Sequence, residues 1–284
     1  MIAPADYAFL SELLQKESGL ALGTGKEYLL ESRLPPVAQK HGFADLAALA
    51  RALRSVPRRD LIKAVCDSMT TGETLWFRDG GPWETLKTQM LPAVAARARA
   101  ERRPIRIWSA ACSSGQEPYS IAMTIADHPS ATAGVKAEIL ATDYCDAVLG
   151  RAKDGVYNQF EVQRGLPVMQ LVKYFTQAPN GFRVNDSLRG SIEWRHANLL
   201  QPFAPGEWDI IFCRNVLIYF DIPTKKDIIE RMTKQLRPGG YLLLGGTETP
   251  FGVTDCVVRH PSKVSGVYVR KDDAAMHEPA AKVA

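Results

Sequence analysis

The pattern of apolar and polar positions is most informative between Trp208 and Phe220, where the chain reads WDIIFCRNVLIYF. An almost wholly apolar run stops at the polar pair Arg214 and Asn215 and then resumes with an aromatic end. Such a run predicts a buried strand, and open parallel sheets bind ligands at the carboxyl ends of their strands. Asn215, with Tyr219 within reach, is therefore a candidate for one wall of a ligand site. The alternative is an asparagine that only caps the following turn.

A second strand is predicted over Ile105–Ala110, followed by the loop ACSSGQEP and by helical spacing of apolar residues over Tyr119–Asp127. Gly115 and its small neighbours would let a ligand approach the backbone. The loop lacks the G-x-G-x-x-G pattern of pyrophosphate sites, so dinucleotide binding is disfavoured. Glu117 stands where the helix begins, either as a ligand contact or only as a first-turn acid favoured by the helix dipole.

A third apolar run, Ile139–Asp143, ends in an acid. In nucleotide-binding folds an acid at this place hydrogen-bonds the ribose hydroxyls. The alternative is that Asp143 caps a helix over 146–151.

The first part of the chain differs from the rest, because from Tyr7 to about Val65 it has helical periodicity. Apolar stripes at helical spacing are formed by Phe9, Leu10, Leu13 and Leu14 and by Leu46, Leu49, Ala50 and Leu53. A small helical module is therefore predicted.

The later part alternates strand and helix after a connecting helix around Pro82–Arg99. It includes an amphipathic stretch over Lys225–Leu236, a turn at Pro238–Gly240 and a strand over Tyr241–Gly245. The alternation predicts an α/β fold in which helices cover both faces of a mostly parallel sheet.

Two segments depart from that alternation. The residues 180–195 are expected to form a small antiparallel excursion, with short strands around Asn-Asp and Arg-Gly turns. The chain after Arg270 has no apolar period and is expected to be disordered.

The composition narrows the class of protein. The 284 residues are 46% apolar, enough for a buried core, and their net charge of +4 mildly favours acidic partners. No apolar run approaches the ~20 residues of a membrane span, and the N-terminus lacks a signal-peptide core, so a soluble cytoplasmic protein is expected. The five cysteines are far apart with no C-x-x-C motif, and the five histidines are not read as close pairs with one another or with a cysteine, so neither a disulfide framework nor a metal site is expected.

Positive charge accumulates between Arg33 and Lys63, where seven cations face two acids and leave a net charge of +5. Such a run is often only a solvated helix surface. It also fits an acidic partner, and it fits nucleic acid less well because it lacks interleaved aromatic residues for base stacking.

Several motifs together resemble those of one family. They are MTTGETLWFR (69–78), WSAACSSGQEPYSIA (108–122), ILATD (139–143), HANLLQPF (196–203), IFCRNVLIYF (211–220) and LRPGGYLLLGGTE (236–248). In content and order they resemble the chemotaxis receptor methyltransferases, often called CheR, over nearly the whole chain from Phe9 to Val269. The EPYSIA and CRNVLIYF blocks are specific to that family, whereas the RPGG turn is shared by class I methyltransferases.

The resemblance implies a class I methyltransferase (Rossmann-like) sheet with a small antiparallel β-subdomain, preceded by an all-α N-terminal domain. The implied division is a helical domain over 1–70, a linker and connecting helix over 71–104, a methyltransferase domain over 105–270 with the β-subdomain at about 176–196, and a disordered tail over 271–284.

The resemblance also implies an activity. Members transfer a methyl group from S-adenosyl-L-methionine to glutamate side chains of chemoreceptors, leaving glutamate methyl esters and S-adenosyl-L-homocysteine. The expected partner is the receptor's cytoplasmic domain, docked through the basic helices 33–63, with no nucleic acid and no membrane insertion. The expected protein is a cytoplasmic monomer recruited to receptor arrays. Whether the β-subdomain grips a receptor C-terminal peptide stays open.

The implied site has two groups of residues. Arg78 and Tyr219 would orient the substrate carboxylate near the methyl group, although Arg78 beside Asp79 also reads as a surface arginine. Gly72 stands where the family often has asparagine and is left out of the site. The implied cofactor contacts are Thr74 and Arg78 with the methionine part, Glu117 with the amino group, Asp143 with the ribose, Asn198 and Leu199 with the adenine, and Asn215 and Val216 with the methionyl side.

Two other functions remain possible from the residues alone. A methyltransferase acting on RNA or on a small molecule would share the cofactor fold, since fold does not determine substrate. A non-catalytic module would sense the methyl donor and hold a partner, but the joint presence of Arg78, Asn215 and Tyr219 speaks against it.

Overall fold

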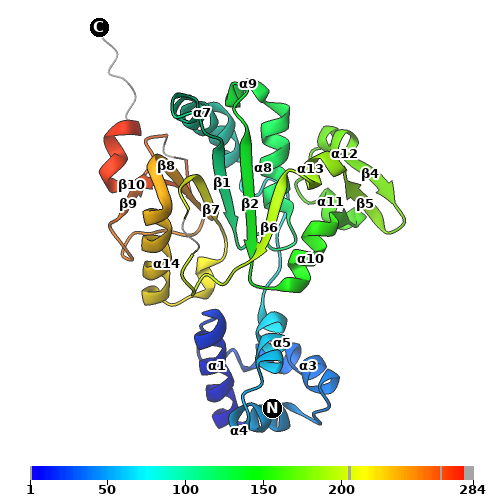
Figure 1. The fold of residues 1–284 in the computed structure, drawn as a ribbon. Coiled ribbons are helices and arrows are strands. Elements are labelled where there is room, and N and C mark those ends of the chain that lie inside the picture. Colours follow the sequence, from blue (N-terminus) through cyan, green and yellow to red (C-terminus); the bar gives the residue numbers. More distant parts are fainter. Residues whose placement is uncertain (1, 204–205, 263, 278–284) are drawn as a thin grey trace. The chain divides into compact units, whose positions relative to one another are not determined.

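The computed structural model describes residues 2–203, 206–262 and 264–277, which divide into two compact units. The first unit holds the chain up to Gly72 together with Tyr219–Thr224. The second holds Glu73–Ile218 and the chain from Lys225 onward. Figure 1 shows that the first unit is helical and that the second is built around a sheet.

In its described part the first unit is all-helical. Its helices are α1 (Pro4–Ser18), α2 (Glu27–Arg33), α3 (Pro35–Lys40), α4 (Leu46–Ser55) and α5 (Arg59–Met69). The predicted apolar stripes point inward, since Leu10 and Leu14 of α1 and Leu49 and Leu53 of α4 are buried. Asp45 begins α4 as its N-cap, where the carboxylate accepts a hydrogen bond from the Ala48 N–H at 2.7 Å. The predicted all-α first part is confirmed.

The second unit, within its described ranges, contains a seven-stranded sheet in the order β6-β2-β1-β7-β8-β10-β9. The strands from β6 to β8 are parallel, and β10 is antiparallel to both of its neighbours. The strands are β1 (Ile105–Ala110), β2 (Ala137–Asp143), β6 (Ile192–His196), β7 (Trp208–Cys213), β8 (Leu236–Leu244), β9 (Val257–Arg259) and β10 (Val267–Arg270). The order reverses between β1 and β7, and in open α/β sheets the ligand crevice lies at that point.

Helices alternate with these strands and pack around the sheet (Figure 1). They are α6 (Gly81–Thr85), the π-helix η1 (Leu86–Met90), α7 (Leu91–Ala100), α8 (Gln116–Asp127), α9 (Pro129–Thr132), α10 (Asp146–Asp154) and α14 (Ile222–Gln235). The predicted connecting helix belongs to the core, because Trp83 of α6 stacks on Phe212 of β7 with ring centroids 5.7 Å apart. Strand β7 is buried at every position, as predicted. Among the described helices, none combines the length and the apolar character needed to cross a membrane.

This unit also holds a small antiparallel sheet, in the order β3-β5-β4. Its strands and the helices around it are β3 (Val156–Tyr157), α11 (Gln159–Gln163), α12 (Val168–Tyr174), β4 (Phe175–Ala178), β5 (Gly181–Val184) and α13 (Asp186–Arg189). The predicted small antiparallel sheet is confirmed, but its predicted extent of about 176–196 is wrong. Ile192–His196 is β6 and pairs in parallel with β2. An edge strand exposes alternate side chains, so the segment had the same short alternation as a hairpin strand.

The predicted turn at Pro238–Gly240 is also corrected, because these residues lie inside β8. The register of β7 and β8 shifts by three residues between Trp208, which faces Leu236, and Ile210, which faces Tyr241, and Gly239 has a φ of 71°. A bulge therefore replaces the turn, and glycine permits the left-handed backbone there.

The predicted disorder after Arg270 is wrong for the residues that are described. Lys271–His277 form the 3₁₀-helix η3, and buried Asp273 accepts a hydrogen bond from the Gly239 N–H at 2.9 Å. The ring of His277 packs against Tyr241 and His260, with centroids 4.9 and 5.4 Å apart. The polar sequence gives no sign of this helix, because its hydrogen bond to Gly239 and its ring contacts with Tyr241 and His260 join residues far apart in the chain. The rest of the predicted tail, 278–284, lies outside the described residues.

The packed His277 makes the stability of the second unit depend on pH. Burial, with His260 and Arg97 nearby, lowers the pKa of His277 from 6.5 to about 4. The folded protein then binds this proton less readily than the unfolded chain does, so stability should be lost as pH falls from above 6.5 toward 4. We expect the fall in melting temperature between pH 7.5 and pH 5 to be smaller in His277→Asn than in the wild type. His128→Asn, outside this cluster, should keep the wild-type fall, and an equal fall in all three proteins would contradict the assignment.

Candidate functional site

The carboxyl ends of four adjacent parallel strands bring the predicted site residues of the second unit to one edge of the sheet. Asp143 is the last residue of β2, and Asn198 follows β6 by two residues. Glu117 opens α8 just beyond β1, and Asn215 follows β7. Because β6, β2, β1 and β7 are neighbours, these residues share the edge where open sheets bind ligands.

The backbone at this edge is unusual. Among the described residues, positive φ in a non-glycine residue occurs at seven positions, and five of them lie in the loops discussed here. These five are Phe77, Asp79, Ala111, Ser113 and Asn215. Residues held in such sparsely populated backbone regions cluster at functional sites, where the surrounding structure fixes them.

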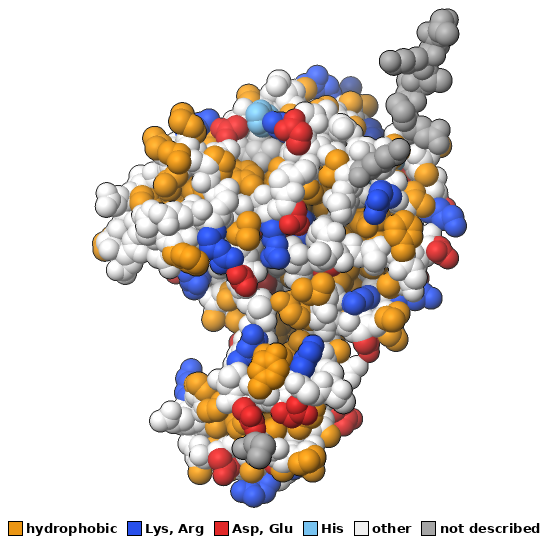
Figure 2. Space-filling view, turned by 180° about the vertical axis from the view of Figure 1, so that it is seen from behind, with side chains coloured by type: hydrophobic (Ala, Val, Ile, Leu, Met, Phe, Trp, Pro, Cys, Tyr) orange, Lys and Arg blue, Asp and Glu red, His pale blue; other side chains and the backbone are white. Residues whose placement is uncertain are grey.

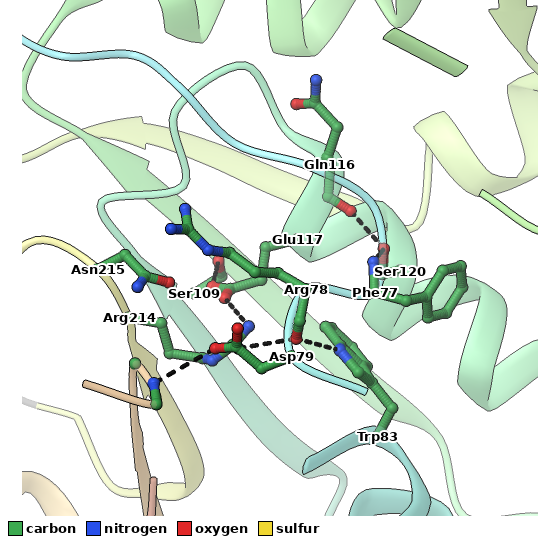
Figure 3. Close-up of polar contacts among 12 residues, drawn as sticks. Phe77, Arg78, Asp79, Trp83, Ser109, Gln116, Glu117, Ser120, Arg214 and Asn215 are labelled. Carbon is green, nitrogen blue, oxygen red and sulfur yellow. Dashed lines mark hydrogen bonds and ion pairs between the residues drawn. The ribbon is translucent and has the colours of Figure 1, made fainter. Parts of the chain in front are cut away.

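Arg214 organises the centre of the site and was not predicted to do so (Figure 3). Its side chain is 1% exposed, and its guanidinium pairs with Asp79 at 2.7 Å and with Glu117 at 3.2 Å. It also donates to the backbone carbonyl of Arg78 at 2.8 Å. A buried guanidinium between two carboxylates keeps its charge compensated, and the contacts tie the loop at 78–79 to the end of β7.

Glu117 is held from two sides. The Ser109 hydroxyl donates to one carboxylate oxygen at 2.8 Å, and Arg214 contacts the other. Burial raises the pKa of the Glu117 carboxyl above its ordinary value, and the Arg214 guanidinium opposes that shift. The acid is more than a first-turn helix charge, because both of its oxygens belong to this network.

Arg78 brings an unpaired guanidinium to this edge. Within the described ranges its guanidinium makes no hydrogen bond or ion pair, while its backbone carbonyl accepts from Arg214 and from the Trp83 indole. Figure 3 shows its side chain extending along the strand ends in the direction of Asn215. A fixed backbone with an unpaired guanidinium suits recognition of a carboxylate. Thr74 lies half-buried on the same segment.

Asp143 is buried at 6% exposure and accepts backbone hydrogen bonds on both of its carboxylate oxygens. They come from the N–H groups of Ser113 at 2.8 Å and Cys145 at 2.9 Å, one to each oxygen. Burial raises the pKa of the Asp143 carboxyl, and backbone hydrogen bonds from Cys145, Ser113 and Tyr144 oppose the shift. Each oxygen keeps further acceptor capacity, so the carboxylate can still receive ligand hydroxyls.

Gly115 does not have the role that its sequence suggested. A Cβ on this residue would lie 2.8 Å from the Ala152 Cβ and 3.0 Å from the Tyr157 hydroxyl, and its φ is 94°. The protein's own side chains fill the space that a ligand was expected to use. The glycine instead permits close packing and the left-handed N-cap of α8.

The segment after β6 carries the two residues expected at the adenine. Asn198 accepts from the Leu200 N–H at 2.9 Å, and Leu199 is buried. Arg231 of α14 clamps this segment by donating to the carbonyls of Leu199 at 2.6 Å and Gln201 at 2.9 Å. Arg231 was not predicted, because nothing in its local sequence indicates a contact 30 residues away.

Asn215 and Val216 form the loop between β7 and the 3₁₀-turn η2 (Leu217–Tyr219). The Asn215 N–H donates to the buried carboxylate of Glu248 at 2.7 Å. Tyr219 belongs to the first unit and Arg78 to the second, so the pairing of these two side chains on a substrate carboxylate stays a prediction.

These residues fit S-adenosyl-L-methionine in chemistry. The buried acids suit an ammonium group and the ribose hydroxyls, and the unpaired Arg78 guanidinium suits a carboxylate. The fold and this edge define a class I methyltransferase that uses S-adenosyl-L-methionine.

Comparison with known proteins identifies the family. The profile described as "CheR methyltransferase, SAM binding domain" matches residues 72–263, and "CheR methyltransferase, all-alpha domain" matches residues 5–70. The chain therefore belongs to the CheR methyltransferase family. It is 42% identical to "Chemotaxis protein methyltransferase Cher2" of Pseudomonas putida over 88% of this chain and 92% of that protein. It is 43% identical to "Chemotaxis protein methyltransferase" of Vibrio parahaemolyticus (89% and 92%) and 33% identical to its namesake in Escherichia coli (87% and 85%).

Proposed function

We propose that this methyltransferase transfers the methyl group of S-adenosyl-L-methionine to glutamate side chains in the cytoplasmic helices of chemoreceptors, and that the resulting methyl esters serve sensory adaptation. The observation that carries the proposal is the Arg78 guanidinium, unpaired among the described residues and extending along the strand ends where a carboxylate substrate would meet the cofactor. The names of the relatives place them in chemotaxis.

The cofactor supplies a methyl group on a sulfonium, which already carries a good leaving group. A glutamate carboxylate is ionised near neutral pH, so this chain needs no strong general base. Its residues position the reactants: Glu117 takes the amino group, Asp143 the ribose, Asn198 and Leu199 the adenine. Orientation of this kind can contribute about 7 to 11 kcal/mol in well-aligned systems.

Arg78 and Tyr219 are proposed to orient the substrate carboxylate. A very strong ion pair between the enzyme and the substrate carboxylate would stabilise the bound substrate as much as the transition state, so it would not raise turnover. One arginine and one tyrosine hydroxyl hold the carboxylate without that penalty. Thr74 and Val216 are proposed to complete the methionine side of the site.

The proposed receptor contact lies on the basic helices at 33–63. Figure 2 shows acidic and basic side chains interspersed on one face of the helical unit. Arg33 donates to the Met69 carbonyl, and Arg54, Arg58 and Lys63 pair with nearby acids. The cations that remain exposed and unpaired among the described residues are Lys40, Arg51 and Arg59. We infer that these three attract the acidic, glutamate-bearing receptor helices, with one copy of the chain working in the cytoplasm at a receptor array.

Reversing these three charges should slow receptor methylation by lowering the rate at which the enzyme and the receptor associate. For Lys40→Glu/Arg51→Glu/Arg59→Glu we expect kcat/KM for a receptor fragment to fall by about tenfold at low salt, because steering raises association rates by 10-fold or more. The difference from wild type should shrink as salt is added. Initial rates at several salt concentrations measure both effects.

A matched reversal in the second unit is the control for that experiment. Arg102→Glu/Lys153→Glu/Lys234→Glu changes by the same total charge three exposed cations that have no ion pair among the described residues. It should leave kcat/KM nearly unchanged. Equal losses in both triple variants would remove the assignment of the docking surface to the basic helices.

The proposed function is tested with purified receptor cytoplasmic fragments and cofactor labelled on its methyl group. We expect label in a receptor-sized band and its release by mild base, since esters are base-labile and methylated nucleic-acid bases are not. Base-stable label, or label in RNA or a small molecule, would overturn the glutamate assignment. Receptor binding that is the same with and without cofactor and never yields label would indicate a non-catalytic module.

A further inference from the structure

Glu248 lies just beyond the end of β8, and its carboxylate collects backbone donors from two strand ends. One oxygen accepts from the N–H groups of Asn215 at 2.7 Å and Gly245 at 2.6 Å. The other accepts from the N–H groups of Leu217 at 2.7 Å and Ile218 at 3.3 Å. The residue is 6% exposed, so these bonds form away from water.

The carboxylate is compensated by amides and not by a cation. Among the described residues no lysine, arginine or histidine forms an ion pair with Glu248. Hydrogen bonds to an ionised acceptor are shorter and about twice as strong as neutral ones. The Glu248 carboxylate is therefore held by the four N–H groups that donate to it, three of which belong to one short loop.

That loop has a backbone that needs such support. Asn215 has a φ of 59°, a left-handed conformation that is uncommon outside glycine, although asparagine tolerates it best. The loop also crosses Gly245 closely, since a Cβ there would lie 2.6 Å from the Asn215 Nδ2 and 2.7 Å from the Glu248 Oε2. Asn215, Gly245 and Glu248 thus form one packed arrangement at adjacent ends of β7 and β8.

We propose that Glu248 is a positioning residue of the methyl-transfer site. It holds the backbone of Asn215–Ile218 in the conformation that presents Asn215 and Val216 to the methionyl side of the cofactor. The inference rests on the proposed cofactor contacts of that loop and names a residue that acts through it. In Glu248→Gln the side-chain amide would place a donor against backbone donors, so the loop should lose its fixed conformation.

The test uses the full chain and two readouts, calorimetric binding of S-adenosyl-L-homocysteine and amide hydrogen exchange. For Glu248→Gln we expect the Kd to rise roughly tenfold, the effect of about one lost hydrogen bond to a charged group. Exchange should accelerate at the amides of Asn215, Leu217 and Ile218. Glu248→Asp keeps the charge on a shorter side chain and should give an intermediate Kd.

Asp209→Asn is the matched control. Asp209 is also a buried acid that accepts a backbone hydrogen bond, from the Arg106 N–H at 2.8 Å, but it pairs with Arg103 and lies near the start of β7. This variant should lose stability while keeping the wild-type Kd and the protection of the 215–218 amides.

Two outcomes would overturn the inference. One is a Kd in Glu248→Gln and Glu248→Asp within twofold of wild type, and the other is unchanged protection of the loop amides. Neither depends on a receptor substrate. A wild-type protein that binds the cofactor product but never methylates a receptor would instead count against the proposed function.

Discussion

Replacing Asp143 with alanine should weaken binding of S-adenosyl-L-methionine by about 100-fold, or about 3 kcal/mol. The buried carboxylate retains acceptor capacity after receiving the N–H groups of Ser113 and Cys145. The ribose hydroxyls would donate further hydrogen bonds to this carboxylate, and each hydrogen bond to a charged group contributes about 1.5 to 3 kcal/mol. Titration calorimetry with the full chain measures the loss directly.

Two variants separate this effect from a general loss of structure. Asp146→Ala removes an exposed acid three residues further on and should leave the Kd unchanged. Asp143→Asn keeps the size of the side chain and one carbonyl acceptor, so its Kd should fall between those of wild type and Asp143→Ala. If Asp143→Ala bound the cofactor as tightly as wild type, Asp143 would not contact the ribose.

The strand ends could be predicted because they depend on local patterns. A buried strand needs a continuous apolar run, and a ligand-facing loop needs polar residues, so the change from one to the other is visible in the sequence. The predicted strand over 105–110 coincides with β1, and the run ending at Asp143 lies within β2. The α/β class and the helical first part follow from the same periodicities and are confirmed.

The contacts that fix the site could not be predicted in this way, because they join residues far apart in the chain. Arg214 meets Asp79 across 135 positions, and Glu248 meets Asn215 across 33. Arg214 stood out as a polar residue after an apolar strand, but nothing local indicates which acids surround it. Glu248 closes the motif LRPGGYLLLGGTE, whose local sequence reads as an ordinary strand and turn.

The wrong predictions share one physical cause, which is that tertiary contacts override weak local signals. Ile192–His196 alternates like a hairpin strand but pairs with β2 at the edge of the main sheet. Gly239 is predicted to be a turn residue but lies in a bulge, where its N–H donates to Asp273. Asp273 in turn belongs to a polar segment that its own pattern gave no reason to order.

Arg78→Ala should lower the kcat of receptor methylation by about 100-fold while changing the cofactor Kd only a few-fold, since misplacing a reactant by about 1 Å can cost that much. The Arg78 backbone is held by Arg214 and Trp83, whereas its guanidinium has no partner among the described residues. Removing the side chain should therefore disturb the bound glutamate more than the fold. Initial rates with labelled cofactor give kcat, and calorimetry gives the Kd.

The conservative and control variants show whether Arg78 orients the substrate carboxylate or only binds the cofactor. Arg78→Lys keeps the charge but loses the planar pair of donors, so it should recover only part of the lost turnover. Arg99→Ala removes an exposed arginine of α7 and should behave as wild type. Tyr219→Phe, which deletes the proposed second donor, should lower kcat with the same small effect on the Kd. If Arg78→Ala and Tyr219→Phe raised the Kd as much as they lowered kcat, both residues would bind the cofactor, and the substrate carboxylate would have to be oriented by other groups.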